Sequence, residues 1–217
     1  MGLNWHPSDD LLADYGAGTL AEGWSLAMAS HLAMCPDCRA AAIALDAIGG
    51  AALDSLPAVP MTDSALDYAL SAIQDARQQQ PEPPRPASPN AVLPPPLADY
   101  VGGDVDAIKW QSIGGKVRQC ILPTTDGKAS ARLLTIPPGT AVPEHTHSGQ
   151  EIILVLQGSV VDGDAVYGPG DVQQADADVT HMPAAGPGDV CICLLVTDGP
   201  LKFTGLLQKL AGLFAKL

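Results

Sequence analysis

The sequence predicts an α + β fold with two domains, a small helical domain followed by a small β-barrel. Apolar residues follow helical spacing up to about residue 79, and they alternate with a period of two from about residue 97. Eight prolines lie between Pro81 and Pro96, where we expect an extended, semi-rigid spacer. Each half also carries a cluster of histidines with other side chains that bind metals. These three observations set the domain boundaries.

About four helices are expected before the spacer. They cover residues 11–20, 21–34, 36–50 and 64–80. Ser8 or Asp9 is suited to cap the first helix, because a short polar side chain can accept a free backbone N–H. Pro36 can open the third helix, and Gly49–Gly50 is expected to end it. The first domain therefore spans residues 1–79, and the spacer spans residues 80–96.

Short strands separated by Gly and Pro turns are expected in the second domain. They fit residues 110–122, 128–137, 151–161 and 189–197. Such a series is typical of a small barrel or sandwich, and we assign it to residues 97–205. Residues 206–217 return to helical spacing. We expect a C-terminal helix docked on the barrel there rather than a membrane anchor, because the protein is acidic.

The composition restricts the partners and the compartment. The net charge is −13, so a phosphate backbone would repel the chain and direct binding of nucleic acid is not expected. The charge would suit a basic protein partner, although many proteins are simply acidic. No apolar stretch is long enough to cross a bilayer, and the N-terminus lacks a secretory pattern. We therefore expect a cytoplasmic protein with reduced thiols.

The first metal-binding cluster combines imidazole and thiolate. His31 and Cys35 are four residues apart and so share one helix face, Cys38 follows across a Cys-Pro-Asp-Cys turn, and His6 can complete the set. A closed tetrahedral set of this kind suits structural zinc. A thioredoxin-like redox pair is the competing interpretation, but its strand-to-helix context is missing. Reversible thiol oxidation with release of zinc stays open.

The second cluster combines imidazole and carboxylate. His145, His147 and Glu151 have the same parity, so on a strand they face the same side, and His181 follows thirty residues later. Such a set suits zinc, manganese or iron and leaves a coordination position open for catalysis or for sensing. No general base is apparent, because Glu144 is out of phase with the ligands.

Two resemblances follow from these clusters. The run GTAVPEHTHSGQEIILVLQG resembles the first cupin motif, with its fixed positions at Gly139, His145, His147, Glu151 and Gly158. His181 stands where the second cupin motif has its histidine. That motif departs from the pattern because Gly170 comes one residue early and Ala185 replaces a common Asn. The departure affects the local turn more than the ligands. The His-x3-Cys-x2-Cys run with an upstream His resembles the zinc-binding anti-sigma domain.

The combination of a zinc anti-sigma domain, a proline-rich spacer and a cupin barrel resembles the ChrR family of anti-sigma factors. The resemblance implies a non-enzymatic, cytoplasmic inhibitor that masks the RNA polymerase-binding surfaces of a group IV (ECF) sigma factor. It also implies that oxidative stress such as singlet oxygen, sensed through the cupin domain, releases the sigma factor, and that the helical domain suffices for inhibition. The alternative is a metal-dependent cupin oxygenase or isomerase that carries a zinc docking domain.

Other residues carry weaker expectations. The side chains Leu11, Leu12, Leu20 and Leu26 could face the sigma factor, but core positions are favoured for them. Cys120, Cys191 and Cys193 are expected to act as small buried hydrophobic residues.

Overall fold

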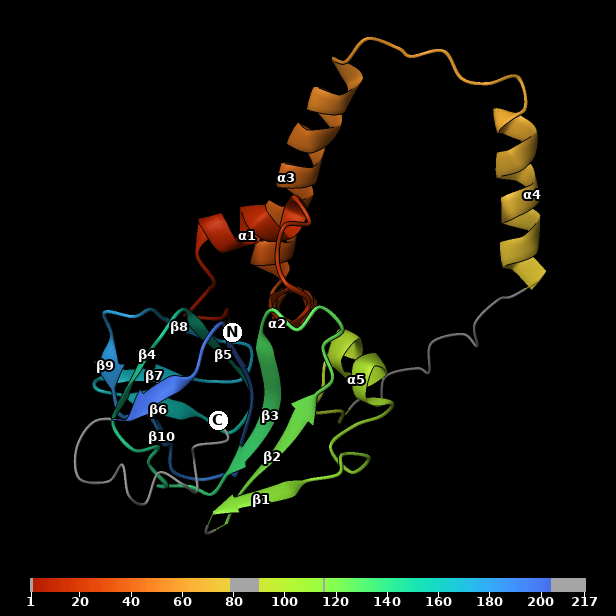
Figure 1. Ribbon diagram of the computed structural model, residues 1–217. Coiled ribbons are helices and arrows are strands. Elements are labelled where there is room, and N and C mark those ends of the chain that lie inside the picture. The colour runs from red at the N-terminus through yellow and green to blue at the C-terminus, as the bar shows by residue number, and fades with distance from the viewer. Residues whose placement is uncertain (1, 79–89, 115, 204–217) are drawn as a thin grey trace.

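The computed structural model describes residues 2–78, 90–114 and 116–203. Five helices are described, namely α1 (Asp9–Gly16), α2 (Glu22–Met34), α3 (Pro36–Asp54), α4 (Ala65–Gln78) and α5 (Pro95–Val101). Figure 1 shows α2 and α5 against a body of β-sheets and α1 beside the base of α3, while α3 and α4 extend away from the body. The expected C-terminal helix at 206–217 lies outside the described residues.

The helices before the spacer begin where the sequence predicts. Ser8 caps α1, and its hydroxyl oxygen accepts the N–H of Leu11 at 3.3 Å. Helix α3 does begin at Pro36, but it runs through Gly49 and Gly50 to Asp54, so the expected end was wrong. A glycine inside a helix costs only about 1 kcal/mol relative to alanine. Neither glycine has a positive φ, and the alanine-rich flanks are strong helix formers.

The end of the proline-rich segment also differs from the expectation. Helix α5 begins at Pro95, within residues expected to be extended. Both prolines of its first turn lie where a missing N–H removes no helical hydrogen bond. Leu93 and Leu97 are 2% and 0% exposed, so this stretch packs against the β domain. Hydrophobic burial therefore overrides the extended tendency of the last prolines.

The C-terminal half forms a cupin-like β domain of three sheets. The largest has the strand order β1 (Gln111–Gly114), β2 (Val117–Leu122), β3 (Ser130–Ile136), β11 (Cys191–Thr197), β5 (Glu151–Gln157) and β8 (Val172–Ala175). The second has the order β10 (Ala184–Ala185), β6 (Val160–Asp162) and β7 (Ala165–Tyr167), and the third has the order β12 (Leu201–Phe203), β4 (His145–His147) and β9 (Thr180–His181). Backbone pairing among the described strands does not join these sheets into the closed barrel that was expected.

Both faces of the central strands β3, β11 and β5 are buried, which explains their continuous apolar runs. On β5, Ile152 and Leu154 face the cluster that includes α2, while Ile153 and Val155 face the interior of the β domain. Because side chains alternate along a strand, Glu151 falls on the same interior face as Ile153. The strand thus carries one metal-binding side chain inward and packs a helix outward.

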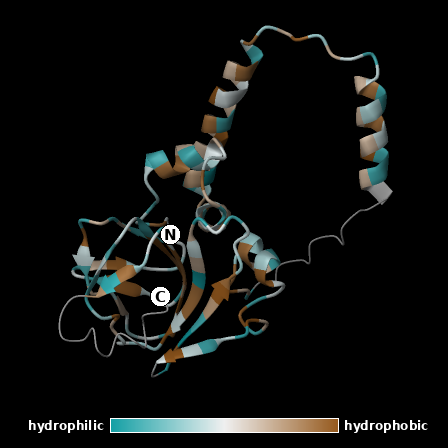
Figure 2. Cartoon of the chain, in the orientation of Figure 1, coloured by the Kyte–Doolittle hydropathy of each residue, from teal (hydrophilic) through white to brown (hydrophobic). Residues whose placement is uncertain are grey.

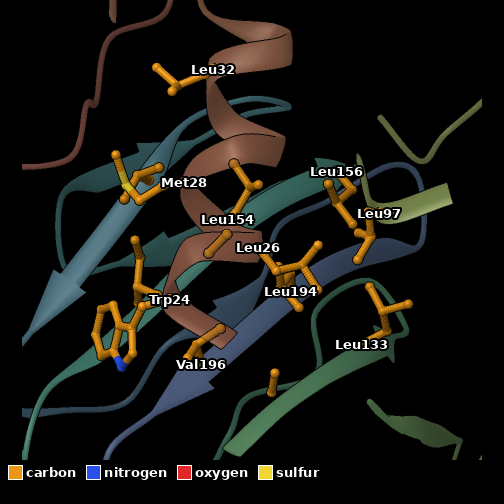
Figure 3. Packing of buried hydrophobic residues seen from close by; sticks show 14 of the residues in the cluster. Trp24, Leu26, Met28, Leu32, Leu97, Leu133, Leu154, Leu156, Leu194 and Val196 are labelled. Atoms are coloured by element: carbon orange, nitrogen blue, oxygen red, sulfur yellow. The ribbon is translucent and has the colours of Figure 1, made fainter. Parts of the chain in front are cut away.

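Helix α2 lies directly on the large sheet (Figure 3). Trp24, Leu26 and Met28 are at most 8% exposed and belong to the same apolar cluster as Leu154 and Leu194 of the sheet. A Cβ atom added at Gly23 would lie 3.2 Å from Ala131 Cβ, so the helix backbone approaches the sheet closely. The helical and β regions therefore share one core. Leu11, Leu12 and Leu26 are buried in it, as the core interpretation expects, and Leu20 is partly buried against it.

Candidate metal sites and interaction surface

The structure brings together the four residues of the N-terminal cluster. One ligand atom from each of His6, His31, Cys35 and Cys38 lies within 4.8 Å of the others. His6 Nδ1 lies 3.5 Å from Cys35 Sγ and 3.2 Å from Cys38 Sγ. The N–H of Cys38 donates to Cys35 Sγ at 3.3 Å, as expected for the turn between the thiols. Cys35 is the cap residue of both α2 and α3 rather than part of a helix, and its extended backbone turns the chain between them.

The chemistry of this cluster fits a bound cation. His31 is 0% exposed, and its Nδ1 lies 2.9 Å from the carbonyl oxygen of Gly170. Its Nε2 is buried without a hydrogen-bond partner in the described part of the chain, as a nitrogen that ligates a metal would be. Burial lowers the pKa of His31 and so favours the neutral imidazole that a ligand must be. Burial, together with the neighbouring Cys35, raises the pKa of Cys38 to about 12, and a cation would oppose this effect.

The structure also brings together the cluster of the β domain. The ligand atoms of His145, His147, Glu151 and His181 lie within 4.8 Å of one another. His145 pairs with His181 across β4 and β9, and their Nε2 atoms are 3.1 Å apart. Glu151 Oε1 lies 3.4 Å from His147 Nε2 and 3.6 Å from His181 Nε2. All four residues are at most 7% exposed.

Each histidine of this cluster is oriented through its Nδ1 atom. His145 Nδ1 contacts the carbonyl oxygen of Pro143 at 2.8 Å, and His147 Nδ1 contacts that of Asp176 at 3.1 Å. His181 Nδ1 contacts Asp162 Oδ2 at 2.8 Å. The Nε2 atoms are thereby directed to a common point, which is the arrangement that metal sites use to fix ring orientation.

In this second cluster the pKa values of His145 and His147 are shifted in opposite directions. Burial lowers the pKa of His145, which favours its neutral form. Burial also acts to lower the pKa of His147, but the nearby Glu151 carboxylate outweighs it, and the pKa of His147 is raised. The His147 Nε2 atom is buried without a hydrogen-bond partner among the described residues, although it lies near Glu151. A cation at the common point would satisfy both the nitrogen and the carboxylate.

An apolar cavity adjoins the second cluster. His145 and Glu151 border it, and its remaining walls are Leu134, Ile136, Val142, Ile153, Val160, Pro183, Ala184, Ala185, Cys193, Leu195 and Leu201. Glu144 is exposed and does not line it, which agrees with its predicted phase. Cys191 and Cys193 are 0% and 1% exposed, whereas Cys120 is only partly buried. The cavity is small and lies directly beside the four ligands.

Sequence reasoning missed the residues that orient the ligands. These are Asp162, Gly170, Asp171, Gln173 and Asp176. Asp162, Gly170 and Asp176 lie 19 to 139 residues from the histidines that they contact, and Asp171 and Gln173 act through other residues, so local spacing carries no signal of them. The early Gly170, which departs from the cupin pattern, was the one visible hint, and the structure gives it a φ of +92°.

A second feature that the sequence left open is a set of exposed apolar side chains on α3, α4 and the segment between them. Figure 2 shows hydrophobic residues recurring along both helices. The members of the set are Ile43, Ile48, Leu53, Leu56, Val59, Met61, Leu66, Tyr68, Leu70 and Ile73, and each is between 49% and 81% exposed. We call this set the arm surface. Large exposed apolar patches on a protein surface usually mark interaction sites. No helix in the described part of the chain is long and apolar enough to cross a membrane.

Known proteins of similar sequence and structure combine the same two parts, a helical N-terminal region and a cupin-like domain. Residues 99–202 match the family model of the ChrR cupin-like domain. The chain is 46% identical to the anti-sigma-E factor ChrR of Cereibacter sphaeroides over the full length of both chains. It is also similar to a crystal structure of Rhodobacter sphaeroides SigE in complex with the anti-sigma ChrR. That match has 45% identity and a TM-score of 0.76 and covers 90% of this chain and 99% of that one.

Proposed function

Because this chain belongs to the ChrR family of anti-sigma factors, we propose that it binds and inhibits a group IV (ECF) sigma factor. Inhibition would result from masking the surfaces with which that sigma factor binds RNA polymerase. The chain is therefore a regulator and not an enzyme. Its relative over the full length is named as an anti-sigma factor, and the similar solved structure is of a complex with SigE.

The arm surface is the observation that carries this proposal. Leu66, Leu70 and Ile73 follow helical spacing along one side of α4 and are 68%, 49% and 52% exposed. Figure 1 shows α4 standing apart from α3 and from the β domain. An amphipathic helix gains most of its stability from packing its apolar side, so a protein partner is the expected cover.

The charge of the helices that carry the arm surface, α3 and α4, favours a basic partner. Helices α3 and α4 and their connection carry Asp37, Asp46, Asp54, Asp63, Asp67 and Asp75, against Arg39 and Arg77. Charges around an apolar interface steer association and reject wrong partners more than they hold the complex together. The basic surfaces that a sigma factor uses to bind DNA and polymerase would match this pattern.

We propose zinc for the N-terminal cluster, with a structural role. His6, His31, Cys35 and Cys38 would hold it and so fix the N-terminus, α2 and the start of α3 in one arrangement. The direction in which α3 leaves the body is then set by the same turn that holds both thiols. On this proposal residues 1–79 form the inhibitory unit, and 80–96 connect it to the cupin domain of residues 97–205.

We propose a divalent metal, zinc, manganese or iron, for the cluster of the β domain. His145, His147, Glu151 and His181 would hold it, and the bound ion would keep a coordination position toward the apolar cavity. The family resemblance supports a role in sensing oxidative stress such as singlet oxygen, with release of the sigma factor in the cytoplasm as the response. A cupin oxygenase or isomerase with a zinc docking domain is the disfavoured alternative, because the full-length relative is a regulator.

Co-purification tests this function. The metal-loaded full-length protein, isolated from its own cells, is expected to carry one sigma factor in a fixed ratio. Added to that sigma factor before core RNA polymerase, the protein should block transcription from the cognate promoter, and it should do so less when added after polymerase. Failure to retain any sigma factor would contradict the proposal, and turnover of a small substrate by the same preparation would favour the enzyme.

A further inference from the structure

One short segment of the β domain touches both metal-binding clusters. It runs from Gly170 to Asp176. It consists of Gly170 and Asp171, strand β8, and Asp176 directly after the strand. Its first residues contact the chain around His6 and His31. Its later residues contact the surroundings of His181 and His147. We call it the bridging segment.

Asp171 holds the part of the chain that carries His6. The residue is only 4% exposed. Its Oδ1 atom accepts hydrogen bonds from the N–H groups of Asn4 at 2.9 Å and Trp5 at 3.1 Å. Its Oδ2 atom accepts the N–H of Gly168 at 2.8 Å, which fixes the carboxylate itself. The N–H of Val172 donates to the carbonyl oxygen of Trp5 at 3.0 Å. The residue directly before His6 is therefore bound on both its N–H and its C=O.

Gly170 orients His31. Its carbonyl oxygen contacts His31 Nδ1 at 2.9 Å, and its own N–H donates to the carbonyl oxygen of Val155 at 2.8 Å. A Cβ atom at this position would lie 2.7 Å from Leu3 Cδ2, and the φ of +92° already favours glycine. The N-terminal segment thus closes directly over the glycine whose carbonyl group orients a ligand.

The other end of the bridging segment reaches the second cluster. Gln173 Nε2 donates to Asp162 Oδ2 at 2.5 Å, and the same oxygen contacts His181 Nδ1 at 2.8 Å. Ala175 pairs with Glu151 in the large sheet, and the carbonyl oxygen of Asp176 contacts His147 Nδ1. Three of the four ligands of this cluster therefore depend on the position of the bridging segment.

We propose that the bridging segment couples the two clusters, with Asp171 as the positioning residue for the N-terminal one. The inference rests on the proposed binding of metal at both clusters. A metal ion at either cluster orders the same segment, so an ion at the other cluster binds at a lower ordering cost. The coupling is reciprocal by thermodynamic necessity. A change at the cupin cluster would then reach the sigma-binding helices through packed contacts, without passing along the proline-rich spacer.

Cobalt titration of the full-length protein provides the test. Cobalt bound to thiolate gives a charge-transfer band, and only the N-terminal cluster contains thiols, so the band reports that cluster alone. Loss of a group that orients a ligand typically costs 10-fold to 100-fold in metal affinity. We expect Asp171→Ala to weaken cobalt binding at the thiols by about 10-fold. Asp171→Asn, which keeps a carbonyl acceptor, should weaken it less and covers the case in which the alanine variant does not fold.

Asp104→Ala is the matched control. Asp104 also accepts two backbone N–H groups, from Val92 and Leu93, but it lies on neither cluster. Its removal costs the same kind of hydrogen bonds and is expected to leave the cobalt affinity of the thiols unchanged.

A double-mutant cycle tests the coupling itself. His145→Ala, which disables the cupin cluster, should weaken cobalt binding at the thiols by about fivefold, the lower end of usual coupling. In a Gln173→Met background, which cannot donate to Asp162 but keeps the contacts of Ala175 and Asp176, that difference should become smaller. If Asp171→Ala and His145→Ala both match Asp104→Ala, the coupling is refuted while the N-terminal metal site stands. If no thiolate band appears in the unaltered protein, the metal site itself fails and the coupling fails with it.

Discussion

Truncation of the apolar side of α4 should weaken binding of the sigma factor without affecting the fold. Leu66, Leu70 and Ile73 leave about half to two thirds of their surface exposed. Full burial of such a side chain contributes about 1.5–3 kcal/mol, so covering the exposed part contributes about 1–2 kcal/mol. Since 1.4 kcal/mol corresponds to tenfold in affinity, each change to alanine is expected to raise the Kd by roughly 5-fold to 30-fold. The triple variant should lose on the order of a thousandfold.

The assay is a direct titration of purified sigma factor with each variant, followed by fluorescence anisotropy. Ile121→Ala is the matched control, because Ile121 is 52% exposed but lies on β2, away from the arms. The free energy of unfolding should stay within about 0.5 kcal/mol of the unaltered value in each single variant, including Ile121→Ala, since these side chains are exposed. Equal Kd values for the triple variant and Ile121→Ala would refute the assignment of the arm surface to the sigma factor.

Three further predictions concern the clusters and the contact between the two regions. Cys38→Ser should prevent closure of the N-terminal metal set and free the sigma factor constitutively, so a mutant that still represses a promoter reporter would count against a structural metal. His181→Ala should lower the ratio of stressed to resting reporter expression toward one, and an unchanged ratio would remove the cupin cluster from the sensor. Hydrogen bonds from Thr125 and Tyr100 lower the pKa of Glu22. The ionised carboxylate therefore stabilises the folded state at any pH above the usual pKa of glutamate, and this contribution is lost as the pH falls through the lowered pKa. Glu22→Gln should therefore flatten the acid side of a plot of unfolding free energy against pH, and an unchanged slope would show that this contact does not contribute.

Much of both metal clusters was predictable because their ligands are local in sequence. His31, Cys35 and Cys38 span two helix ends, and His145, His147 and Glu151 share strand parity, so their chemistry is visible in spacing alone. His6 and His181 needed the family resemblance or the closure of a ligand set. The groups that orient these ligands could not be found, because hydrogen bonds such as Gly170 to His31 join residues 139 positions apart.

Some local expectations failed where packing outweighed propensity. Gly49 and Gly50 do not end α3, and Pro95 begins a helix rather than continuing the spacer. At these positions the preference of glycine or proline against a helix amounts to about 1 kcal/mol or less. The continuing helix offsets it at Gly49 and Gly50, and the burial of Leu97 offsets it at Pro95. Local residues set a preference, and the surrounding contacts decide whether it is followed.

The sequence by itself determined that α4 has one apolar side and that α2 is apolar around most of its circumference, but not what covers these residues. The tertiary structure decided this: Trp24, Leu26 and Met28 are buried in the core that α2 shares with the large sheet and the neighbouring helices, while Leu66, Leu70 and Ile73 remain exposed. The physical reason is that the hydrophobic effect is non-directional, so apolar residues on a helix serve equally well for a core and for an interface. The large sheet lies beneath α2, whereas no described sheet lies beneath α4. The apolar residues of α2 therefore stabilise the fold, and those of α4 are available to bind a partner.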